Sequence, residues 1–323
     1  MAILVCGGAG YIGSHNVVNF IEKGENVIVV DNLQSGYKKA VHSAAKFYEG
    51  DIRSAQILDK IFSENEIDAV IHFAADIVVS ESVINPLKYF NNNVYGMQIL
   101  LGAMVKHGVD KIIFSSTAAV YGEPERVPIF EDDRTAPNNP YGETKLMMEK
   151  IMKWVNLAHG IKYISLRYFN ASGCIEDGSI GEEHKPETHL IPLILQVPSG
   201  KRDHITIYGN DYPTPDGTCI RDYIHVMDLA DAHYLALKYL RGGGESNVFN
   251  LGNGKGFSVK EVIVAAEKVT GQKIKTELGT RRGGDSAILI ASGEKAKKIL
   301  GWSPKYTDIE KIIQTAWNYH SKH

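Results

Sequence analysis

Three side chains that could carry out acid–base chemistry lie in the middle of the sequence: Thr117, Tyr141 and Lys145. Tyr141 and Lys145 are four residues apart, so in a helix they share one face and the ammonium can approach the phenol. A free tyrosine has a pKa of about 10, and a nearby positive charge lowers that pKa by stabilising the phenolate. The pattern therefore predicts a tyrosine base acting on a hydroxyl group, with the Thr117 hydroxyl as hydrogen-bonding partner or proton relay.

The same spacing occurs a second time, in Tyr234 and Lys238. These two residues lie in or beside the segment 228–237, whose apolar spacing is typical of an ordinary packed helix. The first pair has a different context, because Asn139-Pro140 leads into its helix and a strand ending in the hydroxyl residues 115–117 precedes it. We therefore assign the chemistry to the first pair and a structural role to the second.

The chain opens with the elements of a dinucleotide-binding unit. Residues 2–5 are a short apolar run typical of a buried strand, the glycine-rich turn 7–13 follows, and a helix is predicted from about Tyr11 to Lys23. The glycines permit a tight turn and a close approach of the backbone to a pyrophosphate at the helix N-terminus. A second strand, 26–30, ends at Asp31, whose carboxylate would accept hydrogen bonds from ribose hydroxyls and repel a 2′-phosphate. This favours NAD over NADP.

Asp31 has a structural alternative, as a turn residue before Asn32. Other residues fit the same cofactor: Asp51, after the strand-like stretch 46–50, could meet the adenine amino group. The small alanines within 72–75 follow a further strand and suit close passage of the cofactor. An oxidised nicotinamide would add a second positive charge near the tyrosine, so the combined motifs predict hydride transfer from an alcohol.

Composition limits the classes of function. The 323 residues carry a net charge of −3 with no basic run, so we expect neither a nucleic-acid nor a membrane partner. No apolar stretch has transmembrane length and no charged leader opens the chain, which predicts a cytoplasmic protein. The three cysteines are scattered, and the twelve histidines show no H-E-x-x-H or comparable ligand spacing. We therefore expect no catalytic metal.

The order of elements predicts an α/β protein. Strands and helices alternate to about residue 170, which favours a doubly wound parallel sheet. We expect an NAD-binding Rossmann domain at 1–175 and a smaller, mixed α/β substrate lobe at 176–323, with the chain free to return to the sheet. A long helix is predicted over 91–107, and the proline-rich segment 121–140 predicts an extended surface excursion.

In the second lobe, Arg221, Arg281 and Arg282 are candidates for binding phosphate, because guanidinium groups bind phosphate oxygens bidentately. Eight stretches of the chain complete the set of motifs: 7–15, 31–32, 50–53, 71–75, 141–145, 166–170, 209–218 and 221–228. Together they resemble the extended short-chain dehydrogenase/reductase superfamily, and within it the UDP-glucose 4-epimerase family, over essentially the whole chain. The glycine motif is widely shared, whereas the sequence at 209–214 is far more specific.

The resemblance implies reversible inversion at C4 of a UDP-hexose through a 4-keto intermediate, with tightly bound NAD and a homodimer formed through the 91–107 helix and the helix beginning near Tyr141. It implies that Tyr141 takes the hydroxyl proton and that Lys145 binds the nicotinamide ribose. The implied cofactor-binding residues are Gly7, Gly10, Tyr11, Ile12, Gly13, Asp31, Asn32, Asp51, Ile52, Phe73, Ala74, Ala75, Asn93, Ser115, Tyr141, Lys145 and Tyr168. The implied substrate-binding residues are Thr117, Tyr141, Asn170, His189, Leu190, Tyr208, Arg221, Arg282, Asp285 and Leu289.

Several positions depart from the family pattern. Thr117 replaces the commoner serine but keeps the hydroxyl. Asp76-Ile77 stands where relatives carry leucine and lysine, which removes a cationic contact, and His189 replaces an asparagine that meets the nucleotide. Leu289 is a tyrosine in members with less room at the sugar's C2 substituent. We therefore expect some turnover of UDP-N-acetylglucosamine.

Four alternative functions make different demands on the sequence. A nucleotide-sugar dehydratase needs an acid and a base directly after the hydroxyl residue, where this chain has Ala118-Ala119. A reductase using exchangeable NADPH would need a basic residue near position 31. A 4-epimerase of uronic acid or pentose sugars stays open. A non-catalytic dinucleotide sensor has no need of the intact Thr117, Tyr141 and Lys145.

Overall fold

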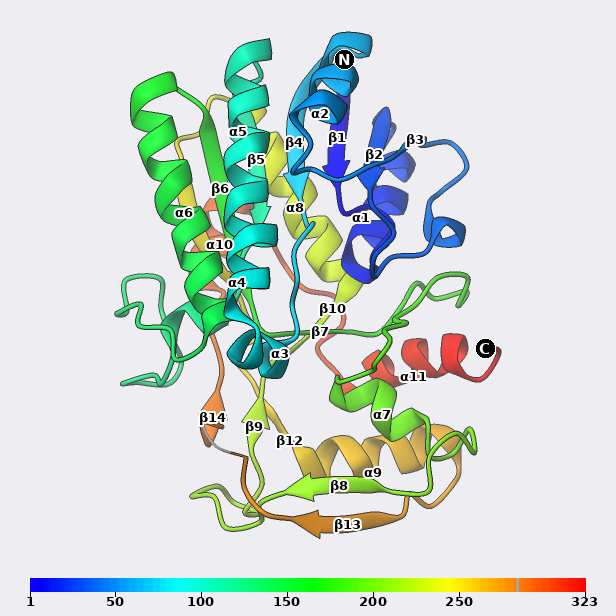
Figure 1. Ribbon diagram of the computed structural model, residues 1–323. Coiled ribbons are helices and arrows are strands. Elements are labelled where there is room, and N and C mark those ends of the chain that lie inside the picture. The colour runs from blue at the N-terminus through cyan, green and yellow to red at the C-terminus, as the bar shows by residue number, and fades with distance from the viewer. Residues whose placement is uncertain (283–284) are drawn as a thin grey trace.

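The centre of the molecule is a parallel sheet of seven strands, drawn in the upper part of Figure 1. The computed structural model describes residues 1–282 and 285–323. The strands are β1 (Ala2–Cys6), β2 (Val27–Asp31), β3 (Lys46–Glu49), β4 (Ile67–His72), β5 (Lys111–Ser115), β6 (Lys162–Tyr168) and β11 (Asn247–Leu251). Their order is β11-β6-β5-β4-β1-β2-β3, and each neighbouring pair is parallel. The predicted doubly wound sheet is confirmed, and its seventh strand comes from the second half of the chain.

Helices cover both faces of this sheet because successive strand residues point to opposite sides. Ile3 and Val5 face a core formed with α1 (Tyr11–Glu22), α8 (Val226–Arg241) and α10 (Glu294–Leu300). Leu4 and Cys6 face the opposite core. That core is completed by α2 (Ala55–Glu64), α5 (Gly96–His107) and α6 (Pro140–His159). Strands buried on both faces explain the continuous apolar runs of the sequence.

A smaller lobe lies below the carboxyl ends of the strands in Figure 1, with its own apolar core. Its helices are α7 (Leu190–Leu195), α9 (Val259–Thr270) and α11 (Ile309–His320). Its strands are β8 (Ile205–Tyr208), β9 (Ile220–Arg221), β12 (Phe257–Ser258), β13 (Thr276–Gly279) and β14 (Ile288–Leu289). A short parallel pair, β7 (Asn170–Ser172) and β10 (Tyr223–His225), lies between this lobe and the sheet. Because β11 is a strand of the large sheet and α8 packs against that sheet, both parts of the molecule contain residues beyond 175. The division at 175 stays a prediction.

One predicted helix begins earlier and is less regular than expected. The sequence predicts a helix over 91–107, whereas the helical segment starts with α4 (Pro86–Tyr89), after α3 (Val79–Ile84), and passes through a π-helical stretch η2 (Phe90–Tyr95) before α5. Proline suits a first helical turn, which explains the earlier start. Two short 3-10 turns, η1 (Lys38–Ala40) and η3 (Ala118–Tyr121), occur in loops. Between η3 and the start of α6 at Pro140, the predicted excursion forms no helix or strand, as its prolines predict.

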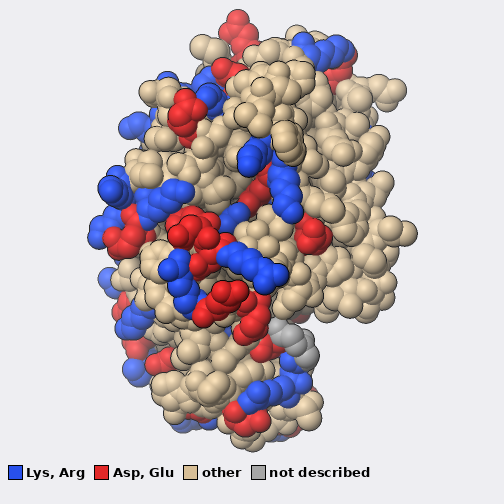
Figure 2. Space-filling view, turned by 90° about the vertical axis from the view of Figure 1, so that its left-hand side faces the viewer, with Lys and Arg blue, Asp and Glu red and all other residues tan. Residues whose placement is uncertain are grey.

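The surface carries positive and negative side chains side by side on the face shown in Figure 2. Within the described residues, none of the helices combines the length and the apolar character required to cross a bilayer.

Candidate active site

The glycine-rich turn between β1 and α1 is shaped by close backbone contacts. Gly7 has a φ of +83°, and a Cβ placed on it would lie 2.6 Å from the Ala74 nitrogen. A Cβ on Gly13 would lie 2.1 Å from the Gly7 oxygen, whereas one on Gly10 would meet nothing nearer than 3.5 Å. No side chain caps the N-terminus of α1, so its backbone N–H groups point out of the helix without a side-chain acceptor. Glycines that pack the turn and an uncapped helix end fit a dinucleotide pyrophosphate.

Asp31 lies at the end of β2, held by the backbone. One carboxylate oxygen accepts a hydrogen bond from the Ala9 N–H at 3.0 Å and the other accepts from Leu33 N–H at 2.8 Å. Burial raises the pKa of Asp31, while these two hydrogen bonds act in the opposite direction. Each oxygen keeps a further lone pair, so the side chain fits the predicted pair of ribose hydroxyls.

Asp51 has a partner that the sequence reasoning missed. Arg53 donates to both of its oxygens, at 2.9 and 2.6 Å, and Asn32 donates to one of them at 3.2 Å. The hydrogen bonds from Arg53 lower the pKa of Asp51 to about 2. The neighbouring Ile52 is buried. The adenine contact predicted for Asp51 would therefore be made by a carboxylate fixed in orientation by an arginine two residues away.

Asn93 ties the turn after β4 to helix α6. Its side-chain nitrogen donates to the Asp76 oxygen at 3.1 Å and to the Thr144 hydroxyl at 3.0 Å, and its oxygen accepts from the Asp76 nitrogen at 2.8 Å. Both amide hydrogens are therefore used within the protein. Asn93 positions the turn containing Phe73 and Ala74, whose two N–H groups donate to the Cys6 oxygen. The Asp76 carboxylate lies 3.9 Å from the ammonium of Lys88, so a cation is present at this departure from the family pattern.

Local sequence places Tyr141 and Lys145 at the start of α6. The Asn139 side chain caps the helix and Pro140 occupies its first turn, a combination that favours helix initiation. The Lys145 ammonium lies 6.0 Å from the centre of the Tyr141 ring and donates to the Ser115 backbone oxygen at 2.8 Å. The two side chains thus meet at the carboxyl end of β5, as the spacing predicts.

The hydroxyl groups predicted to join this pair lie beside it. Ser115 and Tyr168, at the ends of β5 and β6, share a short hydrogen bond between their hydroxyls. Thr117 caps the following turn by accepting from the Ala119 N–H at 3.1 Å, and its side chain also hydrogen-bonds Tyr141. The structure thus brings Ser115, Thr117, Tyr141, Lys145 and Tyr168 into one site.

The electrostatics of the pair differ from the prediction. Burial raises the pKa of Tyr141 to about 12, although the hydrogen bond with Thr117 acts to lower it. Burial likewise lowers the pKa of Lys145 to about 7, against the attraction of Glu149. Desolvation of the phenolate thus dominates, and Lys145 is not among the groups that lower the pKa of Tyr141. A base near neutral pH requires further positive charge at this site, which an oxidised nicotinamide would supply.

A buried network behind the pair was not anticipated from the sequence. Glu149, one turn after Lys145, accepts from the Ser116 hydroxyl at 2.6 Å and binds Arg167 bidentately at 3.0 and 2.5 Å. Arg167 also donates to the Tyr121 hydroxyl, which donates to the Asn250 side chain. The network joins α6, β6, η3 and β11 behind the active site. The available signal was the i, i+4 spacing from Lys145 to Glu149.

Five of the predicted substrate residues come together in the smaller lobe. Arg221 and Leu289 are partners in the parallel strands β9 and β14. Arg282 donates to Asp285 at 2.9 Å and lies over the ring of Tyr208 at 4.9 Å, while Arg221 lies 3.9 Å from Asp285. The guanidinium groups and the exposed aromatic ring suit a nucleoside diphosphate.

Leu289 connects this group to the catalytic side chains. It packs against the apolar cluster that includes Ala118 and Tyr121, directly after Thr117. The residue predicted to limit the sugar's C2 substituent is therefore close to the wall that carries the catalytic hydroxyl.

The remaining predicted residues have other partners. Asn170 donates to the Asp222 backbone oxygen at 3.0 Å, where β7 meets β10. Arg281 binds Asp211 at 2.6 Å, whereas Arg282 binds Asp285. His189 contacts the carboxylate of Glu182 at 2.8 Å, and Leu190 begins α7.

The sheet, the uncapped α1 and the site at the strand ends are those of a dinucleotide-dependent enzyme. Residues 3–252 match the model of the NAD dependent epimerase/dehydratase family, and the chain belongs to that family.

Relatives of full length narrow the class further. The UDP-glucose 4-epimerase of Lacticaseibacillus casei is 58% identical over 323 residues, covering 100% of this chain and 98% of the relative. A crystal structure of a UDP-glucose 4-epimerase matches with a TM-score of 0.99 and 54% identity, covering 100% of this chain and 98% of that one. The structure of UDP-glucose 4-epimerase from Bifidobacterium longum in complex with NAD+ and UDP matches with a TM-score of 0.94 and 40% identity, covering 100% and 99% of the two chains.

Proposed function

We propose that this protein is an NAD-dependent epimerase that reversibly inverts C4 of a UDP-hexose, interconverting UDP-galactose and UDP-glucose. The observation that carries the proposal is the meeting of Tyr141, Lys145 and Thr117 at the carboxyl end of β5. It is supported by the arginine pair Arg221 and Arg282 of the smaller lobe and by the full-length relatives.

The glycine-rich turn and Asp31 would hold NAD, which would supply a hydride acceptor and donor for C4 of the sugar. Tyr141 takes the proton of the C4 hydroxyl and gives it back, and Thr117 hydrogen-bonds the same phenol and orients it. Lys145 is held by the Ser115 oxygen, so its ammonium stays near the phenol throughout the cycle. Arg221 and Arg282 hold the diphosphate of the substrate. Binding energy from the UDP part then anchors the flat 4-keto sugar while it turns its other face to the cofactor.

The proposed sugar range includes N-acetylated substrates. Leu289 is shorter than the tyrosine of narrower family members and packs against the Ala118 wall. A UDP-N-acetylhexosamine is therefore expected to be turned over as well. Brisk turnover of UDP-galactose with complete inertness toward UDP-N-acetylglucosamine would refute this extension and leave the main proposal standing.

The main proposal is tested by mixing the purified protein with UDP-galactose and no added nicotinamide. We expect UDP-glucose to form until both sugars reach equilibrium, without net change in cofactor absorbance. A requirement for stoichiometric added NADPH would indicate a reductase, and preference for UDP-glucuronate or UDP-xylose would indicate the alternative 4-epimerase. Binding of NAD without turnover of any of these sugars would favour a sensor.

We also propose a homodimer formed through α5 and α6. Trp154 and Leu157 on α6 are 69% and 68% exposed, and Tyr95 and Val105 lie exposed on the neighbouring helical segment. These helices lie side by side in Figure 1. The right-hand side of Figure 2, which is the front of Figure 1, carries few charged groups. Exposed apolar side chains of this size are typical of a protein interface.

The dimer is tested by sedimentation equilibrium of Trp154→Glu, which should be monomeric where the parent chain is a dimer. The matched control is Val264→Glu, a charge placed on the 51% exposed Val264 of α9, which should leave the mass unchanged. A monomeric parent chain would contradict the proposal.

We place the enzyme in the cytoplasm on compositional grounds, which fractionation of the source cells would test.

A further inference from the structure

Four side chains that could bind a metal converge on the loop before α7. They are Glu182, His184, Glu187 and His189, and the ligand atoms of the four lie within 4.8 Å of one another. The Nδ1 atom of His184 lies 3.4 Å from Glu182 and 3.5 Å from Glu187, and Nδ1 of His189 lies 2.8 and 3.3 Å from the same two carboxylates. Both imidazoles therefore turn the same ring nitrogen toward the same pair of acids.

The four groups face one another, and three of their four nitrogen–oxygen contacts are longer than an ordinary charge-assisted hydrogen bond. Glu182 is 5% exposed, and its Oε1 meets Nδ1 of both histidines, at hydrogen-bond length for His189 and at 3.4 Å for His184. Zinc bonds to imidazole and carboxylate are about 2.0–2.2 Å long, which separates neighbouring ligand atoms of a tetrahedral site by about 3.3–3.6 Å. Three of the four nitrogen–oxygen distances fall in that range. We propose that Glu182, His184, Glu187 and His189 form a binding site for one zinc ion.

The chemistry of the ligands selects the metal. Two imidazoles disfavour Mg²⁺ and Ca²⁺, which prefer oxygen ligands, whereas Zn²⁺ accepts nitrogen and carboxylate oxygen together. A divalent ion also balances the charge of the two carboxylates. With all four positions occupied by protein, the site is of the structural kind.

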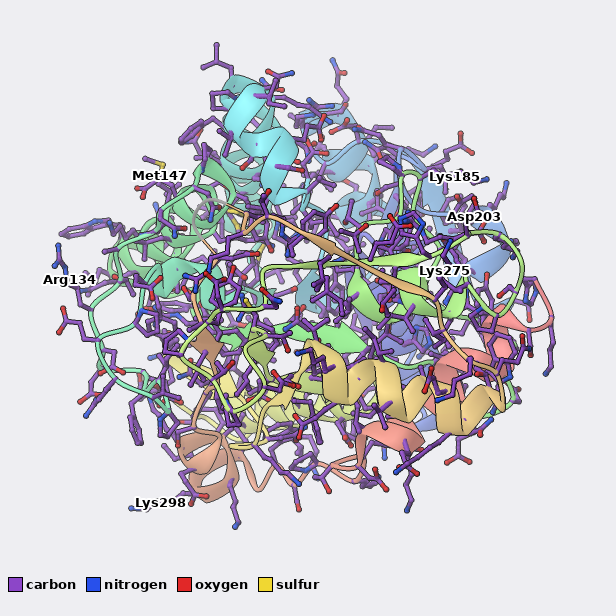
Figure 3. The ribbon with its side chains drawn as sticks, turned by 90° about the horizontal axis from the view of Figure 1, so that it is seen from below. Arg134, Met147, Lys185, Asp203, Lys275 and Lys298 are labelled. Atoms are coloured by element: carbon purple, nitrogen blue, oxygen red, sulfur yellow. The ribbon has the colours of Figure 1, made fainter. Side chains whose placement is uncertain are left out.

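The surroundings hold the ligands in place. The Glu187 carboxylate accepts hydrogen bonds from the backbone N–H groups of Thr188 and His189, both at 2.8 Å, which fixes its orientation as outer-shell contacts do in metal sites. Lys39 binds Glu183 in the same loop at 2.9 Å. Lys185, labelled in Figure 3, lies beside the ring of Tyr37. The loop is thus attached to the region that follows β2.

The site lies between the two parts of the molecule. The ring of His184 meets the ring of Tyr11 edge-on at 6.3 Å, and Tyr11 begins helix α1 at the glycine-rich turn. His189 is the residue before α7, and Leu190 is its first residue. In Figure 1 this green loop lies between α1 and the helices α7 and α11. Bound zinc would therefore fasten the smaller lobe to the cofactor turn and take no part in proton or hydride transfer.

The sequence analysis expects no catalytic metal, because the histidines show no H-E-x-x-H or comparable ligand spacing, and the four residues here are spaced as Glu-x-His-x-x-Glu-x-His. The irregular loop brings together ligands whose spacing along the chain fits no common helical motif. The inference goes beyond the proposed epimerase activity and does not depend on it.

The experiment measures metal content in the purified protein with its cofactor. The chain is incubated with ZnCl₂, passed over a desalting column, and analysed by elemental mass spectrometry. We expect about one zinc per chain and a higher Tm than after treatment with chelator, since a ligand that binds only the folded state stabilises it. The variants Glu182→Gln and His189→Gln should retain little zinc, with affinity reduced at least about 100-fold.

The matched control is His204→Gln. His204 lies 3.3 Å from Glu277, a similar histidine–carboxylate distance outside the four-residue cluster. This variant should keep one zinc per chain. Cobalt replacing zinc should give the intense visible bands of tetrahedral coordination in the parent chain and not in His189→Gln.

Less than about one tenth of a zinc per chain in the folded parent, or equal zinc in the parent, Glu182→Gln and His189→Gln, would overturn the proposal. Should Glu182→Gln fail to fold, the half-exposed His189 still provides the test. If the parent chain binds no zinc, the four side chains are two protonated histidines paired with two carboxylates.

Discussion

The chain contains two tyrosine–lysine pairs with the same spacing and almost the same geometry. In α6, the Lys145 ammonium lies 6.0 Å from the centre of the Tyr141 ring, and in α8 the Lys238 ammonium lies 5.9 Å from the Tyr234 ring. The difference is in their surroundings, because Lys145 is 2% exposed and Lys238 is exposed. Spacing alone therefore does not distinguish a catalytic pair from a surface pair.

What distinguishes the α6 pair is its position at the carboxyl ends of β5 and β6. Those strand ends supply Ser115 and Tyr168, and Thr117 follows directly. In the α8 pair, Tyr234 packs against Phe20 and has a second lysine, Lys23, at 5.6 Å from its ring. A buried cation beside hydroxyl groups can tune a base, whereas a solvated cation on a helix exterior cannot.

The largest difference between the two pairs should appear on removing each phenol hydroxyl. Tyr141→Phe should lower kcat for UDP-galactose by about 10³-fold or more, because general acid–base catalysis supplies effects of this order. Tyr234→Phe should change kcat by less than about twofold, since only packing is altered. The measurement is initial-rate kinetics with quantification of bound NAD, which both variants should retain. Equal activities would show that the α6 pair is not catalytic.

The second difference is the residue that follows each lysine by four positions. Position 149 is a glutamate bound to buried Arg167, whereas the position four residues after Lys238 is Gly242, the residue that follows the end of α8. Glu149→Gln should lower the free energy of unfolding by about 3–5 kcal/mol, because it leaves a buried guanidinium without its counter-charge. Glu64→Gln, which removes an exposed carboxylate 4.0 Å from the ammonium groups of Lys46 and Lys60, should cost less than about 1 kcal/mol. Urea unfolding measures both, and a cost below 1 kcal/mol for Glu149→Gln would show that Arg167 is solvated.

Much of this arrangement is predictable from the sequence, for identifiable reasons. The sheet follows from continuous apolar runs such as 2–5, and the catalytic helix follows from Asn139 and Pro140 at its start. What the sequence cannot give is the balance of burial against charge: the spacing predicts a lowered pKa for Tyr141, and desolvation raises it to about 12. Partners distant in sequence, such as Arg167 for Glu149, depend on how β6 packs behind α6.

The third difference between the pairs is a dependence of stability on pH. Burial lowers the pKa of Lys145 to about 7 from 10.5, so between these values the unfolded chain binds more protons than the folded chain. Stability contributed through Lys145 therefore rises with pH across that window. The raised pKa of Tyr141 acts only above its ordinary value of 10.0.

In the cofactor-free protein, Lys145→Met should flatten the rise in the free energy of unfolding between pH 7 and pH 9, because methionine does not titrate. Lys238→Met on α8 is the control and should keep the slope of the parent chain. Urea unfolding at three pH values measures the slopes. Parallel curves for all three proteins would mean that Lys145 is solvated in the folded state.

The smallest expected effect concerns Leu289, which lies near the segment that follows Thr117 beside the α6 pair and has no counterpart beside the α8 pair. Leu289 of β14 packs against the cluster containing Ala118 and Tyr121, so a larger side chain at 289 takes space from the sugar and not from the proton-transfer groups. Leu289→Tyr should lower kcat/KM for UDP-N-acetylglucosamine about 10-fold or more, since steric discrimination in a pocket is worth about 1–3 kcal/mol. Turnover of UDP-galactose should change by less than about twofold. Equal losses for both sugars would mean that Leu289 supports the catalytic wall itself, and the room at C2 would then be set elsewhere.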